Sequence, residues 1–159
     1  MKRNKYIDIA YIIIIGITLG AVLATGIFVA PVVFNSAKYL GEEILSHYQE
    51  GLLMTAIFLK MNYLLNFTAF LIIIREAYAF KLFERDRITV AAAITSVFAI
   101  FMFTLYYTPD IVAMQMAGEE MTGSETFDKV HKASEIDFKL LALSLAVLMG
   151  RRIINLNRR

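Results

Sequence analysis

Three apolar segments of this chain are each long enough to cross a lipid bilayer, at residues 7–34, 52–74 and 88–107. A helix needs about 20 apolar residues to span roughly 30 Å of hydrocarbon, and inside a bilayer only helices and closed barrels satisfy their own backbone. A fourth segment, residues 136–152, continues the pattern although Asp137 and Lys139 interrupt it. The sequence therefore predicts an all-α fold: an integral membrane four-helix bundle formed by a single domain over residues 1–159.

The composition belongs to the same class. The chain is 58% apolar and 19% charged, with a mean hydropathy of +0.62, whereas soluble domains are about half apolar and a quarter charged. The first segment follows a basic start, but its apolar run far exceeds the usual signal-peptide core of about 7–15 residues, so we interpret it as a retained helix. The absence of cysteine excludes disulfides and thiolate chemistry.

Basic residues gather before helix one, between helices two and three, and after helix four. The two remaining loops are long and acidic. By the positive-inside rule, this asymmetry places both termini in the cytoplasm and predicts a multi-pass protein of the bacterial inner membrane. The basic residues that carry the prediction are Lys2, Arg3, Lys5, Arg75, Lys81, Arg85, Arg87, Arg151, Arg152, Arg158 and Arg159.

The outer loops contain further helix signals. Residues 35–51 have apolar side chains at helical spacing and predict a short helix on the membrane surface. Thr108-Pro109-Asp110 is typical of a turn that ends helix three, and either Thr122 or Ser124 is a candidate cap for helix four. A helix from there to about Asn155 would be roughly 45–50 Å long and would extend beyond the outer surface.

One stripe of helix four should face the other helices, because its residues recur at heptad spacing. The stripe consists of Phe127, Val130, Ser134, Asp137, Leu141, Ser144 and Leu148.

Ionisable residues inside a membrane are expensive and are candidates for function. Lys60 in helix two and Asp137 in helix four lie at a similar depth, about 21–23 Å above the inner boundary, and could form an ion pair that closes a polar cavity open to the outside. The alternative is that Lys60 and Lys139 extend separately to the outer headgroups while Asp137 sits in the interface.

Uncharged polar and small residues mark two helix faces. Asn62 and Asn66 are one turn apart and either join helices by hydrogen bonds or line a solute site. Gly16, Gly20 and Ala24 form a pattern that lets a neighbouring helix approach closely. Pro31 lacks an amide donor and predicts a kink at the outer end of helix one.

A metal site is a further possibility that the residue types raise. Thioether and imidazole ligands suit copper(I), and the candidates are Met114, Met116, Met121 and His131; methionines also commonly serve packing. The two histidines, His47 and His131, are both expected near the outer surface, which disfavours haem ligation within the bilayer. We therefore expect no cofactor, with copper or haem as the alternatives.

Catalytic and nucleotide-binding motifs are absent from the sequence, so we expect no enzymatic activity. The short basic clusters suit anionic lipid headgroups better than nucleic acid.

Two segments resemble the signatures of the transmembrane protein 205-like family. They are Gly20-Ala21 with Gly26-Ile27-Phe28-Val29-Ala30-Pro31-Val32-Val33-Phe34, and Phe127-Asp128-Lys129-Val130-His131-Lys132-Ala133-Ser134. The resemblance implies a four-helix integral membrane protein and assigns no reaction. Eukaryotic members are associated with platinum-drug resistance and vesicle traffic, and most bacterial members are described as a domain of unknown function. The shared motifs draw attention to Pro31, His131 and Ser134.

The leading hypothesis is a membrane protein that binds or passes a small solute, ion or amphiphile. The ligand would occupy an outward-facing polar cavity between helices two and four, with Lys60, Asn62, Asn66, His131, Ser134 and Asp137 as candidate residues. The alternatives are a non-catalytic structural or accessory subunit, either a homo-oligomer or part of a larger membrane complex, and a soft-metal or haem protein.

Overall fold

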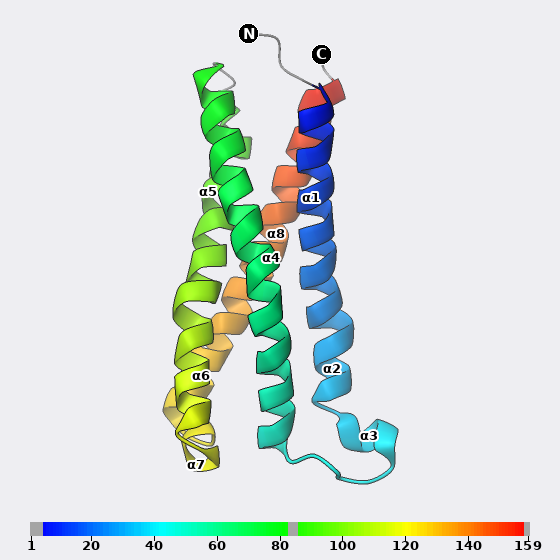
Figure 1. Ribbon diagram of the computed structural model, residues 1–159, viewed down its shortest axis with the longest axis vertical. Helices are drawn as coiled ribbons and strands as arrows, with labels where there is room; N and C mark the ends of the chain where they lie inside the picture. Colours follow the sequence, from blue (N-terminus) through cyan, green and yellow to red (C-terminus); the bar gives the residue numbers. More distant parts are fainter. Residues whose placement is uncertain (1–4, 83–85, 158–159) are drawn as a thin grey trace.

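The computed structural model describes residues 5–82 and 86–157, which form four long helical rods and no strand (Figure 1). The short helices α3 and α7 lie at the end of the molecule opposite the chain termini (Figure 1). In chain order the elements are α1 (Lys5–Ala24), η1 (Thr25–Val29), α2 (Ala30–Val33), α3 (Ser36–Leu40), α4 (His47–Lys81), α5 (Arg87–Phe101), η2 (Met102–Tyr107), α6 (Thr108–Met116), α7 (Glu119–Thr122) and α8 (Glu125–Asn157), where η1 and η2 are π-helical.

Three of the rods are long and apolar enough to cross a membrane: Lys5–Val33, His47–Lys81 and Arg87–Met116. Large apolar side chains remain exposed along them, for example Ile17 on α1, Phe70 on α4 and Phe98 on α5. A water-soluble protein rarely exposes such a continuous apolar surface, whereas a lipid-facing surface requires one. The fold is therefore all-α, with three candidate membrane-spanning helices in the described residues.

The rods enclose an apolar core at the centre of the molecule. α8 packs against α1 and α5, and α4 packs against the same two helices. The largest fully buried side chains of the core include Ile15 of α1, Leu65 and Ile72 of α4, Ile100 of α5, and Leu141, Leu145 and Leu148 of α8.

Small polar side chains cross-link the rods inside this core. The hydroxyls of Thr18 and Thr68 are 2.7 Å apart between α1 and α4, and the Ser96 hydroxyl donates to Ser144 at 2.9 Å between α5 and α8. Such bonds are typical of membrane helix interfaces, where small residues permit close approach and each bond contributes about 0.6 kcal/mol.

The predicted stripe on α8 is confirmed. Ser134, Asp137, Leu141, Ser144 and Leu148 are buried, and Phe127 and Val130 are half-buried. Ser124, rather than Thr122, caps this helix, because its hydroxyl accepts a hydrogen bond from the Phe127 amide. With 33 residues, α8 is about 50 Å long.

Two helix ends differ from the prediction. α4 begins at His47 rather than near Leu52, because Ser46 and Gln49 form a capping box. The predicted turn at Thr108-Pro109-Asp110 is wrong, since the helix continues through it as α6 to Met116. The predicted surface helix over residues 35–51 is limited to α3, five residues long.

The π-helical turns explain how the rods accommodate proline. η1 precedes Pro31 and η2 precedes Pro109. At η2, both the amide and the hydroxyl of Thr108 donate to the Phe103 carbonyl, five residues back. A proline removes one amide donor and crowds the preceding turn, and a wider turn before it relieves this crowding without ending the helix.

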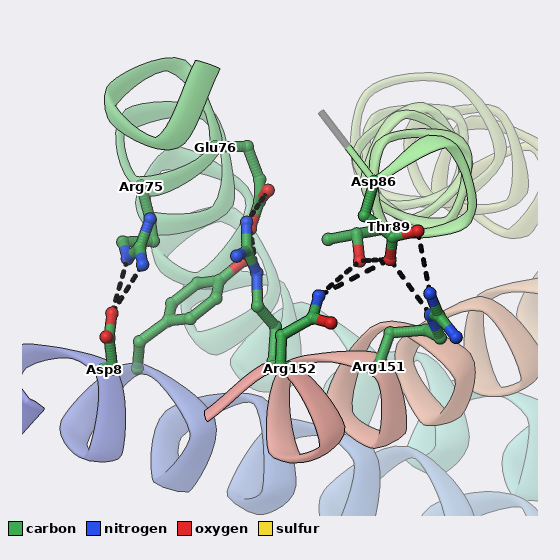
Figure 2. Close-up of polar contacts among 9 residues, drawn as sticks. Asp8, Arg75, Glu76, Asp86, Thr89, Arg151 and Arg152 are labelled. Carbon is green, nitrogen blue, oxygen red and sulfur yellow. Dashed lines mark hydrogen bonds and ion pairs between the residues drawn. The ribbon is translucent and has the colours of Figure 1, made fainter. Parts of the chain in front are cut away.

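Ionic contacts join the rods at the end where the chain termini lie (Figure 2). Arg75 of α4 donates to the Asp8 carboxylate of α1, with Nε 3.0 Å from Oδ1, and both side chains are buried. The adjacent Glu76 accepts hydrogen bonds from the Tyr11 hydroxyl of α1 and from the Arg152 guanidinium of α8. The buried charges therefore link α1 to α4 and α4 to α8.

Asp86, immediately before α5, adds the remaining rod to these contacts. Its carboxylate accepts two hydrogen bonds from Arg151 of α8, at 3.0 and 2.8 Å, and others from Thr89 and Asn155. The Arg151 guanidinium, together with the Thr89 and Asn155 donors, outweighs partial burial and holds the pKa of Asp86 well below its usual range.

We define the ionic network as Asp8, Tyr11, Arg75, Glu76, Asp86, Arg151 and Arg152. Sequence analysis treated Arg75, Arg151 and Arg152 only as orientation signals and missed their acidic partners. Of the other basic residues used for orientation, Lys2, Arg3, Arg85, Arg158 and Arg159 lie outside the described residues.

We expect Asp8 and Arg75 to be energetically coupled. Arg75→Met or Asp8→Asn alone should lower the free energy of unfolding by about 3–5 kcal/mol, because each breaks a buried ion pair and leaves one of its two charges in place. The double variant should lose clearly less than the sum of the two single losses. Denaturant titration of the detergent-solubilised protein measures all three values.

The matched control removes the exposed ion pair between Glu125 and Lys129. Glu125→Ala should change stability by no more than about 1 kcal/mol. Strictly additive losses at Asp8 and Arg75 would contradict the coupling.

The stabilisation from Asp86 should depend on pH. Because the folded-state pKa lies below the ordinary value of about 3.9, ionised Asp86 stabilises the fold above that value, and the contribution is lost as the pH falls toward the folded-state pKa. The difference in Tm between the wild type and Asp86→Asn should therefore be constant near neutrality and shrink below about pH 4. A difference that is unchanged at acidic pH would contradict this account.

Candidate functional site

A cavity of about 1030 Å³ opens among the rods toward the end that carries α3 and α7. Residues of α1, η1, α2, α4, η2, α6, α7 and α8 line it. Its size is at the upper end of the range of roughly 300–1,000 Å³ found for small-molecule sites. The cavity is therefore our candidate functional site.

The inner part of the cavity is apolar. Phe58 of α4, Phe103 of η2 and Phe138 of α8 line it and contact one another, with ring centroids 5.0–5.5 Å apart. Val22 and Met54 add two buried apolar side chains. We call these five residues the floor; it is continuous with the core and offers no charged group to a ligand.

The outer part of the cavity is polar and aromatic. His47 packs on Phe34 at a centroid distance of 5.6 Å, and the His131 ring stacks on Phe127 at 5.8 Å with an interplanar angle of 7°. Carboxylates and one ammonium lie beside these rings. We call the outer lining the mouth and define it as Phe34, His47, Tyr48, Gln115, Glu119, Phe127, Asp128, His131, Glu135 and Lys139.

Contacts of Glu50, Tyr48 and Glu135 fix the geometry of the mouth. Glu50 accepts hydrogen bonds from the Ser36 amide and hydroxyl, which anchors the start of α3 to α4. The Tyr48 hydroxyl donates to the Gln115 carbonyl at 2.8 Å and thereby joins α4 to α6. Glu135 lies 3.4 Å from His131 Nε2 and 3.3 Å from Lys139 Nζ on α8.

Both π-helical turns border the cavity. Gly26 and Ile27 of η1 and Phe103 of η2 line it, as do Ala30 and Pro31 just after η1 and Thr108 just after η2. π-Helical turns are frequent at functional sites because they displace side chains and backbone groups from the regular helical pattern. The predicted irregularity at Pro31 therefore lies in the wall of the candidate site.

The residues that sequence analysis assigned to a polar cavity are not all brought together. His131 and Ser134 line the cavity, whereas Lys60, Asn62 and Asn66 are not among its lining residues. Lys60 is exposed on α4, and Asn66 accepts a hydrogen bond from Thr104 of η2, as expected for an amide that joins helices. The cavity also extends beyond helices two and four, since the first and third rods contribute to its walls.

Asp137 and Asn62 stand apart as buried polar groups. Asp137 lies next to the lining residue Phe138 but does not line the cavity, and its Oδ2 is buried without a hydrogen-bond partner. Asn62 Oδ1 is likewise buried without a hydrogen-bond partner among the described residues. Lys60 and Asp137 form no ion pair in the described part of the chain, so the predicted closing pair is not seen.

The glycine pattern on α1 is only partly packed. A Cβ at Gly16 would lie 3.4 Å from Met149 Sδ of α8, which matches the close approach that the pattern predicts. Gly20 is exposed and would meet nothing within 4 Å, while Ala24 is half-buried.

Two of the candidate methionine ligands, Met114 and Met116, point away from each other. Met114 and Met116 are two residues apart on α6 and therefore point about 200° apart around the helix. Met116 is 84% exposed, and Met121 accepts a hydrogen bond from Ser124. In residues 5–82 and 86–157, no group of three or more histidine, cysteine, aspartate or glutamate side chains could hold a metal ion.

Sequence reasoning missed most of the cavity wall. Phe58, Phe103 and Phe138 resemble any other core residues in sequence, and no signal distinguishes them. Tyr48 and Gln115 could have been found, since each is a hydrogen-bonding residue at the outer end of a long apolar helix.

Comparison with known proteins identifies a family but no described relative. The model of the family described as "Domain of unknown function (DUF4149)" matches residues 13–120, which include most of the first rod, all of the second and third, and the first of the two motif segments. No curated protein and no solved structure matches the chain. Because the match extends over more than half of the sequence, the chain belongs to the DUF4149 family, whose function is unknown.

Proposed function

We propose that this protein is a non-catalytic, multi-pass protein of the bacterial inner membrane that binds or passes a small solute or amphiphile through the cavity. The proposal rests on one observation: a volume of about 1030 Å³ with an apolar floor and a polar mouth at one end of the rods. Largely apolar pockets with a few converging polar groups are the usual form of small-molecule sites.

The proposal includes α8 as a fourth membrane span. Its central residues Leu141, Leu145 and Leu148 belong to the core shared by the three apolar rods, so α8 runs alongside them. In the proposed orientation the ionic network lies at the cytoplasmic surface, together with both termini. The cavity then opens outward, and the start of α8 extends beyond the outer surface.

The motif segments support a role for the cavity. Gly26, Ile27, Ala30, Pro31 and Phe34 of the first segment line it, and so do Phe127, Asp128, His131 and Ser134 of the second. We therefore also propose that the chain is related to the transmembrane protein 205-like family.

The second candidate function is a structural or accessory subunit. Gly20 favours this second function. It is exposed, a Cβ added to it would meet nothing within 4 Å, and a small residue there leaves room for a neighbouring transmembrane helix. A cavity that admits no ligand would leave this candidate as the better explanation.

We expect α8 to cross the membrane. Because the chain has no cysteine, single cysteines report topology without background. Ser124→Cys should react with a membrane-impermeant maleimide on intact spheroplasts, whereas Ile153→Cys should react only after permeabilisation. Lys81→Cys is the cytoplasmic control, and equal labelling of residues 124 and 153 on intact spheroplasts would contradict the fourth span.

We expect a single-chain amphiphile to reach the cavity floor. The chain has no tryptophan, so Phe58→Trp places a single fluorophore there. In nanodiscs, a brominated alkyl glucoside should quench this floor fluorophore in a saturable manner. A second substitution, Ala30→Phe, fills part of the cavity and should weaken this quenching several-fold, as expected when a preformed site loses volume.

Two controls separate entry into the cavity from partition into the bilayer. Val32→Phe adds the same ring close by on α2 but outside the cavity lining, and should leave quenching of the floor fluorophore unchanged. Phe98→Trp places the fluorophore on an exposed face of α5, where quenching should rise in proportion to partition and show no response to Ala30→Phe. Non-saturable quenching of the Phe58→Trp protein would overturn the proposed function.

A further inference from the structure

The cavity has the polarity of an amphiphile, with apolar and polar groups at opposite ends. The floor contains only Val22, Met54 and the three phenylalanines, whereas the mouth carries every charged side chain of the lining. A molecule with a hydrocarbon chain and a polar head could satisfy both ends at once, since burying a head group against the floor would cost several kcal/mol.

The charge of the mouth discriminates between head groups. Glu119, Asp128 and Glu135 contribute three carboxylates, and Lys139 contributes the one lysine of the lining. Lys139 is 3.3 Å from Glu135, and Lys132, which is not a lining residue, is 2.5 Å from Asp128. These two carboxylates are therefore offset locally, and Glu119, which has no ion pair among the described residues, leaves the mouth net negative. An anionic head group would face a net negative field, whereas a cation would be attracted to it.

The aromatic rings favour the same sign of charge. The Phe34–His47 and Phe127–His131 pairs come from different rods and both line the mouth. The faces of aromatic rings attract ammonium groups, and cages of aromatic side chains are the usual recognition site for quaternary ammonium ligands.

A buried polar side chain supplies a third, independent feature. Gln115 is 5% exposed and lines the cavity. Its backbone carbonyl accepts from Tyr48, but its side-chain amide has no hydrogen bond within the described residues. Its side-chain carbonyl oxygen is therefore available to accept from a protonated amine or to stabilise an ammonium.

We infer that the cavity binds a cationic amphiphile, with an amine or quaternary ammonium head at the mouth and its hydrocarbon chain against Phe58, Phe103 and Phe138. The inference deepens the proposed function and depends on it. Glu119, Asp128 and the aromatic pairs select the head group, while the floor accepts any alkyl chain of suitable length.

The test compares three brominated probes of equal chain length: an alkyltrimethylammonium, an alkyl carboxylate and an alkyl glucoside. Each is titrated into nanodiscs of zwitterionic lipid that contain the Phe58→Trp protein. Quenching of the Phe98→Trp protein corrects for partition, and Phe103→Trp replaces the reporter if Phe58→Trp does not fold. We expect half-quenching by the ammonium at a concentration about tenfold below that of the glucoside, with the carboxylate weakest.

Charge-neutralising variants identify the residues responsible. Glu119→Gln combined with Asp128→Asn should reduce the preference for the ammonium several-fold and leave glucoside quenching unchanged. Glu125→Gln is the matched control, because Glu125 is exposed at the start of α8 and outside the lining, and it should retain the preference.

The outcomes separate the two proposals. Saturable quenching by all three probes at equal concentration, or a preference for the carboxylate, would overturn the cationic ligand and leave the proposed function intact. Saturable quenching by none of the probes would overturn both.

Discussion

The structure depends on a set of buried and partly buried ionic contacts that hold four helices together at one end. Arg75, Arg151 and Arg152 each bind a carboxylate from another rod, and together these contacts join α1, α4, α5 and α8. Replacing only one partner of such a pair by an apolar side chain is destabilising, because the other charge is left in place. In a bilayer, apolar side chains gain little from leaving lipid for one another, and specific polar contacts and close packing must determine which helices meet. The ionic network and the Thr18–Thr68 and Ser96–Ser144 pairs supply these contacts.

At the opposite end, the described residues that line the cavity form no ion pair between rods, and the rods there enclose space instead of a packed core. The three phenylalanines of the floor lie where the packed core ends and the cavity begins. This division assigns different roles to the two halves: one specifies the arrangement of the helices, and the other presents a site. The side-chain amide of Gln115 lines the cavity and has no hydrogen bond within the described residues.

Sequence analysis predicted what depends on local pattern. The apolar lengths identified three candidate membrane spans, and the heptad spacing identified the buried face of α8, because burial on a helix repeats every 3.6 residues. It could not predict what depends on distant partners. Arg75 carried the same orientation signal as any basic loop residue, and only the fold places it beside Asp8, 67 residues away. Pro109 has the ordinary properties of a helix terminator, and nothing local reveals that the preceding turn has widened to accommodate it. His131 and Ser134 were found as cavity residues through the motif, but the phenylalanines that form the floor carry no distinguishing mark.

The two π-helical turns also set the rotational phase of each rod. An i→i+5 turn takes up one residue more than an α-helical turn, so the residues beyond it are rotated by about 100° from the positions that a continuous α-helix would give them. Pro31 and Thr108 lie just beyond η1 and η2 and owe their place in the cavity wall to this shift. The length of these turns therefore determines which helix face lines the cavity. A chain shorter by one residue in either turn could keep every ionic contact at the opposite end and still present a different face to the cavity.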